Sequence, residues 1–189
     1  MFDLILKNIS KHIKLTDKEI AFFTSVVISK KLRKRQYLLQ AGDICRYEHF
    51  VTKGLLRAYN IDPDGNERIV MFAPEDWWIS DLYSLLTETP STLHIEALED
   101  SEILCIEKPN LEKLYIGIPK FERFMRISFQ NAFVSQQQRI LSSISQSAED
   151  RYASFISKYP ALTQRIPQIQ VASYLGITPE TLSRIRKKR

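Results

Sequence analysis

The apolar residues at the start of the chain recur with a helical spacing. From Leu4 to about Ser29 they return every third or fourth position, as expected of a helix with one buried face. Thr16 precedes the segment DKEIAFF, where a threonine hydroxyl can accept a hydrogen bond from the first helical turn. We therefore predict helical structure over residues 4–29, with Thr16 as a cap.

From about Lys34 onward, short apolar runs alternate with turn residues. Runs of this length, bounded by Gly, Pro, Asn and Asp, are typical of antiparallel strands. The segment DPDGN at 62–66 is a strong hairpin signal. The pattern predicts an antiparallel sandwich or a barrel-like roll. The expected strands are YLLQAG, EHFVTKG, LLRAYNI, ERIVMFA, LHIEALE and SEILCIE.

A long helix is predicted after the strands, because no glycine or proline lies between Pro119 and Pro160. Its first part carries two apolar stripes on different faces. The first stripe contains Phe129, Phe133, Ile140 and Ile144. The second stripe contains Ile127, Val134 and Leu141. One stripe can pack on the strands and the other on the same helix of a second copy of the chain. Burial of both stripes within one chain is the alternative.

The helical pattern changes near residues 146–149. The segment SQSAEDRYASFISKYP predicts a second helix, with Ser147 as its cap and Pro160 beyond its end. We expect a domain boundary at this change. The expected parts are a β-rich domain at 1–118, a dimerisation helix at 119–146 and a helical domain at 147–189.

The segment PQIQVASYLGITPETLSRIRKKR has the pattern of a helix-turn-helix unit. Pro167 suits the first turn of one helix and Gly176 its end, since glycine tolerates positive φ. Thr178 and Pro179 then suit the cap and the first position of a second helix. Apolar residues stand where the two helices must meet: Val171, Ala172, Leu175, Ile177, Leu182 and Ile185. A helix pair with a purely structural role is the alternative.

The outward face of the second helix predicts contacts with double-stranded DNA. Glu180 can accept a hydrogen bond from cytosine or adenine, Arg184 can donate to guanine, and Ser183 can contact either kind of base. A surface pair between Glu180 and Arg184 is the alternative, and it is compatible with DNA binding. The residues expected at the phosphates are Arg186, Lys187, Lys188 and Arg189. The residues expected at DNA altogether are Thr178, Glu180, Thr181, Ser183, Arg184, Arg186, Lys187 and Lys188.

The net positive charge of the chain comes from its last six residues. Lys and Arg number 27 against 22 Asp and Glu, a net charge of +5. RIRKKR at 184–189 holds five of the bases and no acid, so the rest of the chain is neutral, with 22 of each. A basic segment on a neutral body fits phosphate contact. A solvated run of charge is the alternative.

The composition gives no support to metal chemistry, catalysis or membrane insertion. Cys45 and Cys105 form no CxxC pair, and the three histidines have no metal-ligand spacing. No Ser/His/Asp or Cys/His set can be argued from spacing, so we do not expect an enzyme. The chain has no apolar run long enough to span a membrane and no signal-peptide layout. We therefore expect a cytoplasmic protein without a metal or another resident cofactor.

These segments together resemble the Crp/Fnr family, the bacterial regulators related to the cyclic-AMP receptor protein and the fumarate–nitrate reduction regulator. The likeness is carried by QYLLQAGD, VTKGLLRAY, DPDGNERIV, EDWWISDL, EALEDSEILCIEKPNLEKL and ITPETLSRIRKK. It implies an α+β fold with an N-terminal antiparallel β-roll and flanking helices. The roll, a double-stranded β-helix like that of cyclic-nucleotide-binding domains, would be the effector domain at 1–118.

The same resemblance implies an activity and its partners. A long helix would join two copies into a homodimer. The first stripe supplies the candidate contacts, and the sequence leaves open which of the two stripes forms the seam. A C-terminal helix-turn-helix domain would then bind a two-fold symmetric DNA site with TGA in each half-site. In the family's second helix a Glu is followed, after two residues, by Ser or Gly and then Arg, which here are Glu180, Ser183 and Arg184. RNA polymerase is a further partner that the resemblance implies.

The segment that holds the cyclic phosphate in cyclic-AMP-binding relatives differs here. Those relatives carry Gly-Glu-Leu and, a short segment later, Arg-Ser or Arg-Thr. Here Ser80-Asp81-Leu82 and Ser91-Thr92 stand in their places, and no arginine lies between Arg68 and Arg123. Because a buried phosphodiester without a cation is costly, we do not expect cyclic AMP in the usual mode.

Another small effector could use the same region. The expected pocket residues are Trp78, Ser80, Asp81, Leu82, Ser91 and Thr92. For Trp77 and Trp78, packing in the core or against another domain is the alternative. For the chain as a whole, the alternative to a transcription regulator is a cyclic-nucleotide-binding signalling module whose C-terminus is structural.

Overall fold

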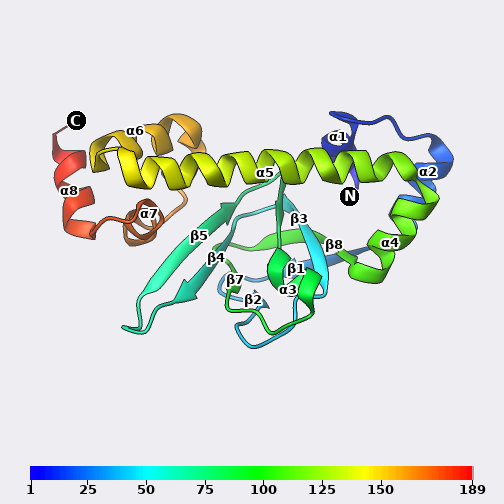
Figure 1. The fold of residues 1–189 in the computed structure, drawn as a ribbon, viewed down its shortest axis with the longest axis horizontal. Coiled ribbons are helices and arrows are strands. Elements are labelled where there is room, and N and C mark those ends of the chain that lie inside the picture. The colour runs from blue at the N-terminus through cyan, green and yellow to red at the C-terminus, as the bar shows by residue number, and fades with distance from the viewer. Residues whose placement is uncertain (189) are drawn as a thin grey trace.

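Two antiparallel sheets form the centre of the molecule (Figure 1), in a computed structural model that describes residues 1–188. One sheet has the strand order β1-β8-β3-β6 and the other has the order β2-β7-β4-β5. The strands are β1 (Val27–Leu32), β2 (Tyr37–Leu39), β3 (Tyr47–Lys53), β4 (Leu56–Ile61), β5 (Glu67–Ala73), β6 (Trp77–Ile79), β7 (His94–Ala97) and β8 (Ser101–Glu107). The predicted α+β class with an antiparallel β-roll is therefore confirmed.

The predicted hairpin joins β4 to β5 through a polar turn. The N–H of Asp62 donates to the Asn66 carbonyl at 3.0 Å, and the N–H of Gly65 donates to the Asp62 carbonyl at 2.9 Å. Asp62 also accepts from the Asn66 N–H at 2.8 Å. The turn is thus held by its own backbone and one carboxylate, as the DPDGN signal predicts.

Two strands, β1 and β6, were not predicted, and one helix was predicted too long. The helical pattern expected to continue to Ser29 ends at Ser25, because the chain from Val27 pairs with β8 along its whole length. This pairing is with residues far along the chain, and such contacts override a local helical spacing. β6 is a three-residue edge strand beside β3, too short for alternation to reveal it.

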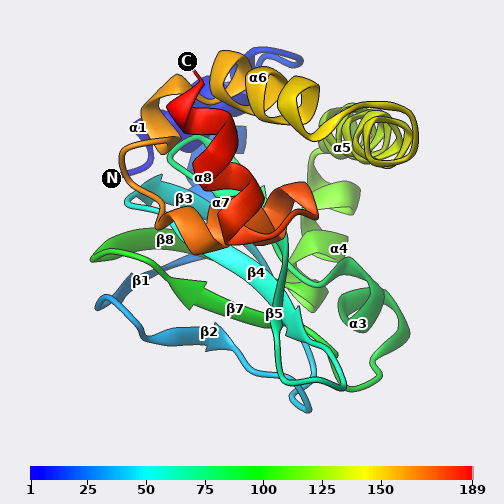
Figure 2. The ribbon, with the colours of Figure 1, turned by 90° about the vertical axis from the view of Figure 1, so that its left-hand side faces the viewer.

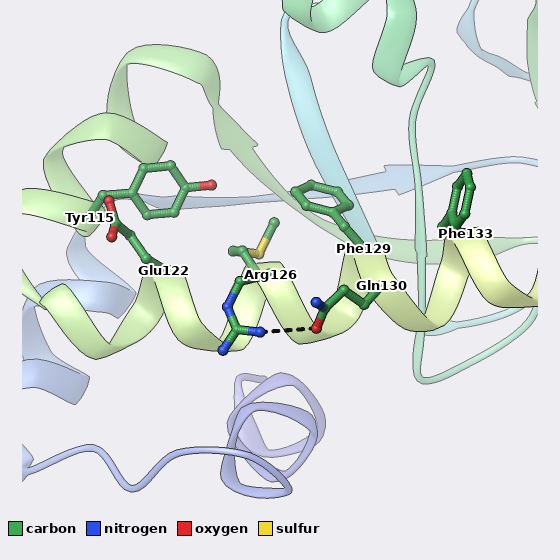
Figure 3. Close-up of a pocket in the computed structure, with 7 residues that line it drawn as sticks. Tyr115, Glu122, Arg126, Phe129, Gln130 and Phe133 are labelled. Carbon is green, nitrogen blue, oxygen red and sulfur yellow. Dashed lines mark hydrogen bonds between the residues drawn. The ribbon is translucent and has the colours of Figure 1, made fainter.

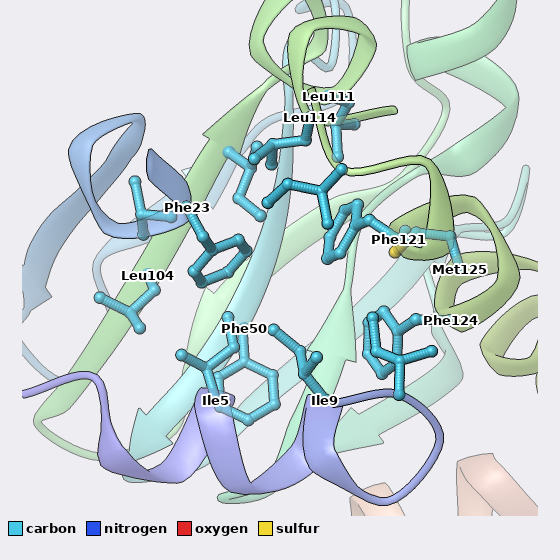
Figure 4. Packing of buried hydrophobic residues seen from close by; sticks show 14 residues of the cluster. Ile5, Ile9, Phe23, Phe50, Leu104, Leu111, Leu114, Phe121, Phe124 and Met125 are labelled. Atoms are coloured by element: carbon cyan, nitrogen blue, oxygen red, sulfur yellow. The ribbon is translucent and has the colours of Figure 1, made fainter. Parts of the chain in front are cut away.

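Helices cover the outer face of the first sheet. They are α1 (Asp3–Ser10), α2 (Asp17–Ser25) and α4 (Lys108–Gly117). Thr16 caps α2 as predicted, since its Oγ1 accepts from the Glu19 N–H at 3.4 Å and Glu19 accepts from the Thr16 N–H at 2.7 Å. Figure 4 shows the buried cluster between these helices and the sheet, which includes Ile5, Ile9, Phe23, Phe50, Leu104, Leu111, Leu114, Phe121, Phe124 and Met125.

A single long helix, α5 (Pro119–Ser145), runs along one side of the roll (Figure 1). After its first turns α5 leaves the two predicted apolar stripes exposed except at Ile127, which is half-buried, so the expected packing of a whole stripe on the strands is not observed. The exposed fractions are 38% for Phe129, 70% for Phe133, 52% for Val134, 59% for Ile140, 50% for Leu141 and 78% for Ile144. Within residues 1–188 no helix is long and apolar enough to cross a membrane.

Three helices at the far end of α5 form a C-terminal bundle. They are α6 (Ala148–Lys158), α7 (Gln168–Leu175) and α8 (Pro179–Lys187). Ser147 caps α6 by accepting from the Asp150 N–H at 3.1 Å, as predicted. Figure 2 shows the bundle lying against β4 and β5. Its buried side chains share one apolar cluster with Leu55, Tyr59, Ile69 and Phe72 of the roll.

Candidate nucleic-acid interface

The turn between α7 and α8 is built as the sequence predicts. Gly176 ends α7 with a φ of 66°, a left-handed conformation that glycine adopts without strain. The N–H of Ile177 donates back to a carbonyl of α7 at 3.0 Å, which closes the helix end. Thr178 then caps α8 by accepting from the Thr181 N–H at 3.2 Å, and Pro179 is the first residue of the helix.

One side of α8 is buried and the opposite side is open to solvent. Leu182 and Ile185 pack in the same cluster as Val171, Ala172 and Leu175 of α7. The exposed residues are Thr178, Glu180, Ser183, Arg184, Arg186, Lys187 and Lys188, with Thr181 half-buried beside them. The expected phosphate contact Arg189 lies outside the described residues. The residues expected at DNA therefore share one accessible face, as far as Lys188.

This exposed face of α8 carries both a hydrogen-bond acceptor, the Glu180 carboxylate, and a hydrogen-bond donor, the Arg184 guanidinium. The backbone N–H of Glu180 and the hydroxyl of Thr178 hold the pKa of the Glu180 carboxyl below its usual value. The guanidinium of Arg184 donates to the Thr181 hydroxyl at 3.2 Å, so it is Thr181 that orients Arg184. A carboxylate and an arginine fork one helical turn apart can read the edges of adjacent base pairs.

In the segment expected to hold an effector, residues 80–92, the buried polar side chains hydrogen-bond to one another. Asp81 begins α3 (Leu82–Thr87), and its Oδ1 accepts from the Ser84 N–H at 3.2 Å. Its Oδ2 accepts from the Ser91 hydroxyl at 2.6 Å, and Ser91 Oγ accepts from the Leu93 N–H at 2.9 Å. Asp81 and Ser91 are both buried. Their polar groups satisfy one another at the positions where the resemblance would place a cyclic phosphate.

The two tryptophans do not join this pair. Trp78 packs on the helix-covered side of the first sheet, with ring centroids 5.2 Å from Phe50 and 6.0 Å from Phe124. Trp77 contacts Tyr159 of the C-terminal bundle edge to face, with centroids 5.8 Å apart. The two tryptophans thus take the places that the sequence left open as the alternative: Trp78 packs against the core and Trp77 lies between the roll and the bundle.

The remaining expected pocket residues are also dispersed. Ser80 donates to Glu48 Oε2 at 2.6 Å, away from its neighbour Asp81, because successive residues of an extended segment point to opposite faces. Leu82 and Thr92 are exposed. Only Asp81 and Ser91 of the six expected residues come together.

An open hollow of about 480 Å³ lies along the surface of α5 (Figure 3). Its lining is mainly apolar and comes from Tyr115, Met125, Phe129 and Phe133. On its polar side, Arg126 donates to Gln130 at 3.0 Å. The first stripe of α5 therefore borders a hollow that a second apolar surface can fill.

Sequence reasoning missed the polar residues that fasten the bundle to the roll. Arg165 pairs with Glu75 and Glu99, and Arg139 and Ser173 bond to the backbone of β5. Each partner is at least 66 positions away along the chain. A polar residue in a helix carries no local signal for such a contact.

Known proteins resemble this chain over most of its length. The family "Cyclic nucleotide-binding domain" matches residues 29–116. Regulatory protein HlyX of Actinobacillus pleuropneumoniae is 26% identical over 183 residues, which cover 90% of this chain and 75% of the relative. The fumarate and nitrate reduction regulatory protein of Vibrio cholerae is also 26% identical, over 90% of this chain and 72% of the relative.

Solved structures share the fold. FixK2 from Bradyrhizobium japonicum superimposes with a TM-score of 0.76 at 20% identity, over 86% of this chain and 84% of that one. The catabolite activator protein of Thermus thermophilus gives a TM-score of 0.56 at 20% identity, over 92% and 83%. The relatives are regulatory proteins and not enzymes. Together with the β-roll, the long helix and the helix-turn-helix, these likenesses make the chain similar to the transcription regulators of the Crp/Fnr family.

Proposed function

We propose that this DNA-binding regulator acts as a homodimer that reads a two-fold symmetric site through α8. The observation that carries the proposal is the exposed face of α8, where Glu180, Ser183 and Arg184 stand over a fully packed helix-turn-helix. A helix fixed in this way can enter the major groove with its first turns toward the bases. The resemblance to the family adds a TGA sequence in each half-site.

The roles of the side chains follow from their chemistry. Arg184 donates to guanine O6 and N7, while Glu180 accepts from the exocyclic amine of cytosine or adenine. Ser183 contacts a base edge beside them, and Thr178 and Thr181 lie at the helix start. Arg186, Lys187 and Lys188 contact phosphates, which adds affinity without sequence preference.

The dimer would form along α5. Isoleucine and phenylalanine side chains that are 59–78% exposed at Phe133, Ile140 and Ile144 are costly in a lone chain. A parallel copy of α5 would cover them and fill the hollow beside Phe129 and Phe133. A symmetric dimer would also present two copies of α8 to two half-sites. RNA polymerase in the cytoplasm is then a further proposed partner.

The effector of this regulator would not be cyclic AMP in the usual mode. The hydrogen bond between Asp81 and Ser91 occupies the place of the missing arginine, and a phosphodiester there would face a buried carboxylate. Calorimetry with cyclic AMP and cyclic GMP separates this proposal from a cyclic-nucleotide signalling module. Micromolar binding of either nucleotide would favour that alternative.

Arg184→Ala should weaken binding to a specific site by roughly 1–3 kcal/mol and relax the preference at one guanine. The reason is the loss of a two-pronged hydrogen bond that only guanine can accept. Titration of wild type and variant against the specific site and against random DNA measures the effect.

The matched control for this titration is Lys188→Ala, which removes a proposed phosphate contact just after the end of α8. It should weaken binding to both DNAs alike and lower the salt dependence. An unchanged ratio of specific to random binding in Arg184→Ala would show that Arg184 does not read a base.

A further inference from the structure

β5 is the edge strand of its sheet, and the C-terminal bundle occupies its free edge. β4 pairs with one side of β5 and no strand follows on the other side within residues 1–188. The N–H of Ile69 donates instead to Ser173 Oγ of α7 at 3.0 Å, and the Ser173 hydroxyl donates to the Glu67 carbonyl at 2.7 Å. The Ser173 hydroxyl therefore satisfies a backbone donor and a backbone acceptor of β5, which a neighbouring strand would otherwise pair.

Arg139 of α5 fills the next positions along the same edge. Its guanidinium donates to the carbonyls of Ile69, at 3.1 Å, and of Val70. It also donates to the Tyr174 carbonyl at 3.4 Å and lies over the Tyr174 ring, 4.3 Å from its centroid. Tyr174 stands two residues before Gly176, the turn into α8. Arg139 thus joins the dimerisation helix, the roll and the helix-turn-helix at one point.

Arg165 makes a second attachment from the segment between α6 and α7. It forms a two-pronged pair with Glu75, at 2.9 and 3.0 Å, and a further hydrogen bond with Glu99. Glu75 also accepts from the Gly54 N–H at 2.9 Å. Burial acts to raise the pKa of the Glu75 carboxyl, but the hydrogen bonds from Arg165 and the backbone hold it below its usual value. The pair is therefore charged at neutral pH.

These polar contacts supply what the apolar contact between the two parts lacks. Leu55, Tyr59 and Phe72 of the roll pack against the bundle, but apolar burial is non-directional and allows one surface to slide on another. Forked hydrogen bonds to fixed carbonyls and carboxylates allow one register only. Apolar burial holds the bundle near the roll, and the polar contacts set its orientation.

We propose that Arg139, Arg165 and Ser173 form a latch that positions α8 by fastening the helix-turn-helix to the edge of β5. The latch fixes the angle of each α8 to α5, and hence the separation of the two α8 helices in a dimer. The spacing between half-sites that the protein accepts is then set by the roll. The part of this proposal that concerns DNA rests on the proposed function above, while the latch itself does not.

The latch is tested without DNA by hydrogen exchange at the Ile69 amide. In the wild type this amide should exchange slowly, because Ser173 is its acceptor at an otherwise open edge. In Arg139→Met/Arg165→Met it should exchange at least about tenfold faster, since the bundle then departs from β5 more often. The control is Arg46→Met/Arg123→Met, which removes two exposed arginines that take no part in the latch.

The positioning role is tested with DNA sites that differ by one base pair between the half-sites. Each added pair turns one half-site by about 34° and moves it by about 3.4 Å. The wild type and the control should lose at least about tenfold in affinity on the altered site, and the latch variant less than about threefold. Dimer content, measured by sedimentation, should be equal in all three proteins.

The outcomes separate the latch from the proposed function. If the Ile69 amide keeps its protection in the latch variant, the latch is refuted, whatever the DNA results are. If protection is lost but the spacing penalty stays, the latch exists and the positioning role is refuted. If the wild type itself shows no site preference, the proposed function fails and the exchange experiment still decides the latch.

Ser173→Ala is a milder variant that tests the same contact if Arg139→Met/Arg165→Met does not fold. It removes one hydroxyl from a half-buried helical position and substitutes the best helix former. The Ile69 amide should again lose protection, by a smaller factor than in the double variant. Unchanged exchange in this variant would contradict the role of Ser173 as the acceptor.

Discussion

Replacing Ile140 and Ile144 by aspartate is expected to convert the protein into a monomer and to weaken its binding to a two-half-site DNA by roughly a hundredfold or more. Both side chains are more than half exposed in the single chain, so the fold of each protomer should tolerate the change. In a dimer they would lie in the seam, where four buried carboxylates repel each other and lose their water. A monomer then binds one half-site at a time.

Sedimentation velocity at micromolar concentration measures the change in mass, and a DNA titration measures the change in affinity. The matched control is Ile28→Asp/Ile61→Asp, which places the same charges on roll residues that are 51% and 52% exposed. It should remain a dimer with wild-type affinity. If Ile140→Asp/Ile144→Asp remains a dimer while Val134→Asp/Leu141→Asp becomes a monomer, the dimer contact lies on the second stripe instead of the first.

Glu48 and His49 are expected to produce opposite pH dependences of stability that cancel in the wild type. Burial raises the pKa of Glu48 to about 7, and it lowers the pKa of His49 to about 4. Glu48 Oε1 is buried and has no hydrogen-bond partner within residues 1–188. The Nδ1 atom of His49 lies 3.1 Å from the Ile79 carbonyl. Both side chains are therefore favoured in their neutral forms.

The signs follow from proton binding in the two states. The raised pKa of Glu48 means that its contribution is present below pH 4.5 and is lost as the pH rises toward about 7. The lowered pKa of His49 means that its contribution is present above pH 6.5 and is lost as the pH falls toward about 4. Each loss amounts to about 3 kcal/mol. Between the two pKa ranges the gain of one offsets the loss of the other.

Replacing one of the two residues should therefore reveal how the other makes the free energy of unfolding depend on pH. In Glu48→Gln the free energy of unfolding should rise by about 3 kcal/mol between pH 4.5 and pH 6.5 from this pair, because His49 is then the one of the two buried groups that still titrates. In His49→Gln it should fall by a similar amount over the same range. Urea unfolding of the Ile140→Asp/Ile144→Asp monomer avoids the concentration dependence of a dimer. If the free energy of unfolding changed with pH in the same direction in both variants, the opposite pKa shifts of Glu48 and His49 would be contradicted.

The helix-turn-helix could be predicted in detail because its signals are local. Gly176, Thr178 and Pro179 act through their own backbone geometry, and Leu182 and Ile185 act through helical spacing. All of these residues have the structural role that the sequence indicates. The exposed stripes of α5 could be recognised for the same reason, since a periodic pattern records which face is apolar.

The rest depends on contacts between distant residues. β1 has a helical spacing and becomes a strand only because β8 lies beside it. The residues expected to line a pocket do not meet, because Trp78 packs on Phe50 and Ser80 bonds to Glu48 on β3. Arg139 is one polar residue among many in α5, and only the fold brings it to the edge of β5. Pairings of this kind cannot be read from one sequence.

Selection of binding sites from a random pool of DNA duplexes tests the central claim most directly. The wild-type protein should enrich a two-fold symmetric site with TGA in each half-site, and Arg184→Ala should lose the preference at one guanine of each half. Enrichment of no sequence, of a single half-site alone, or of the same site by both proteins would contradict the account.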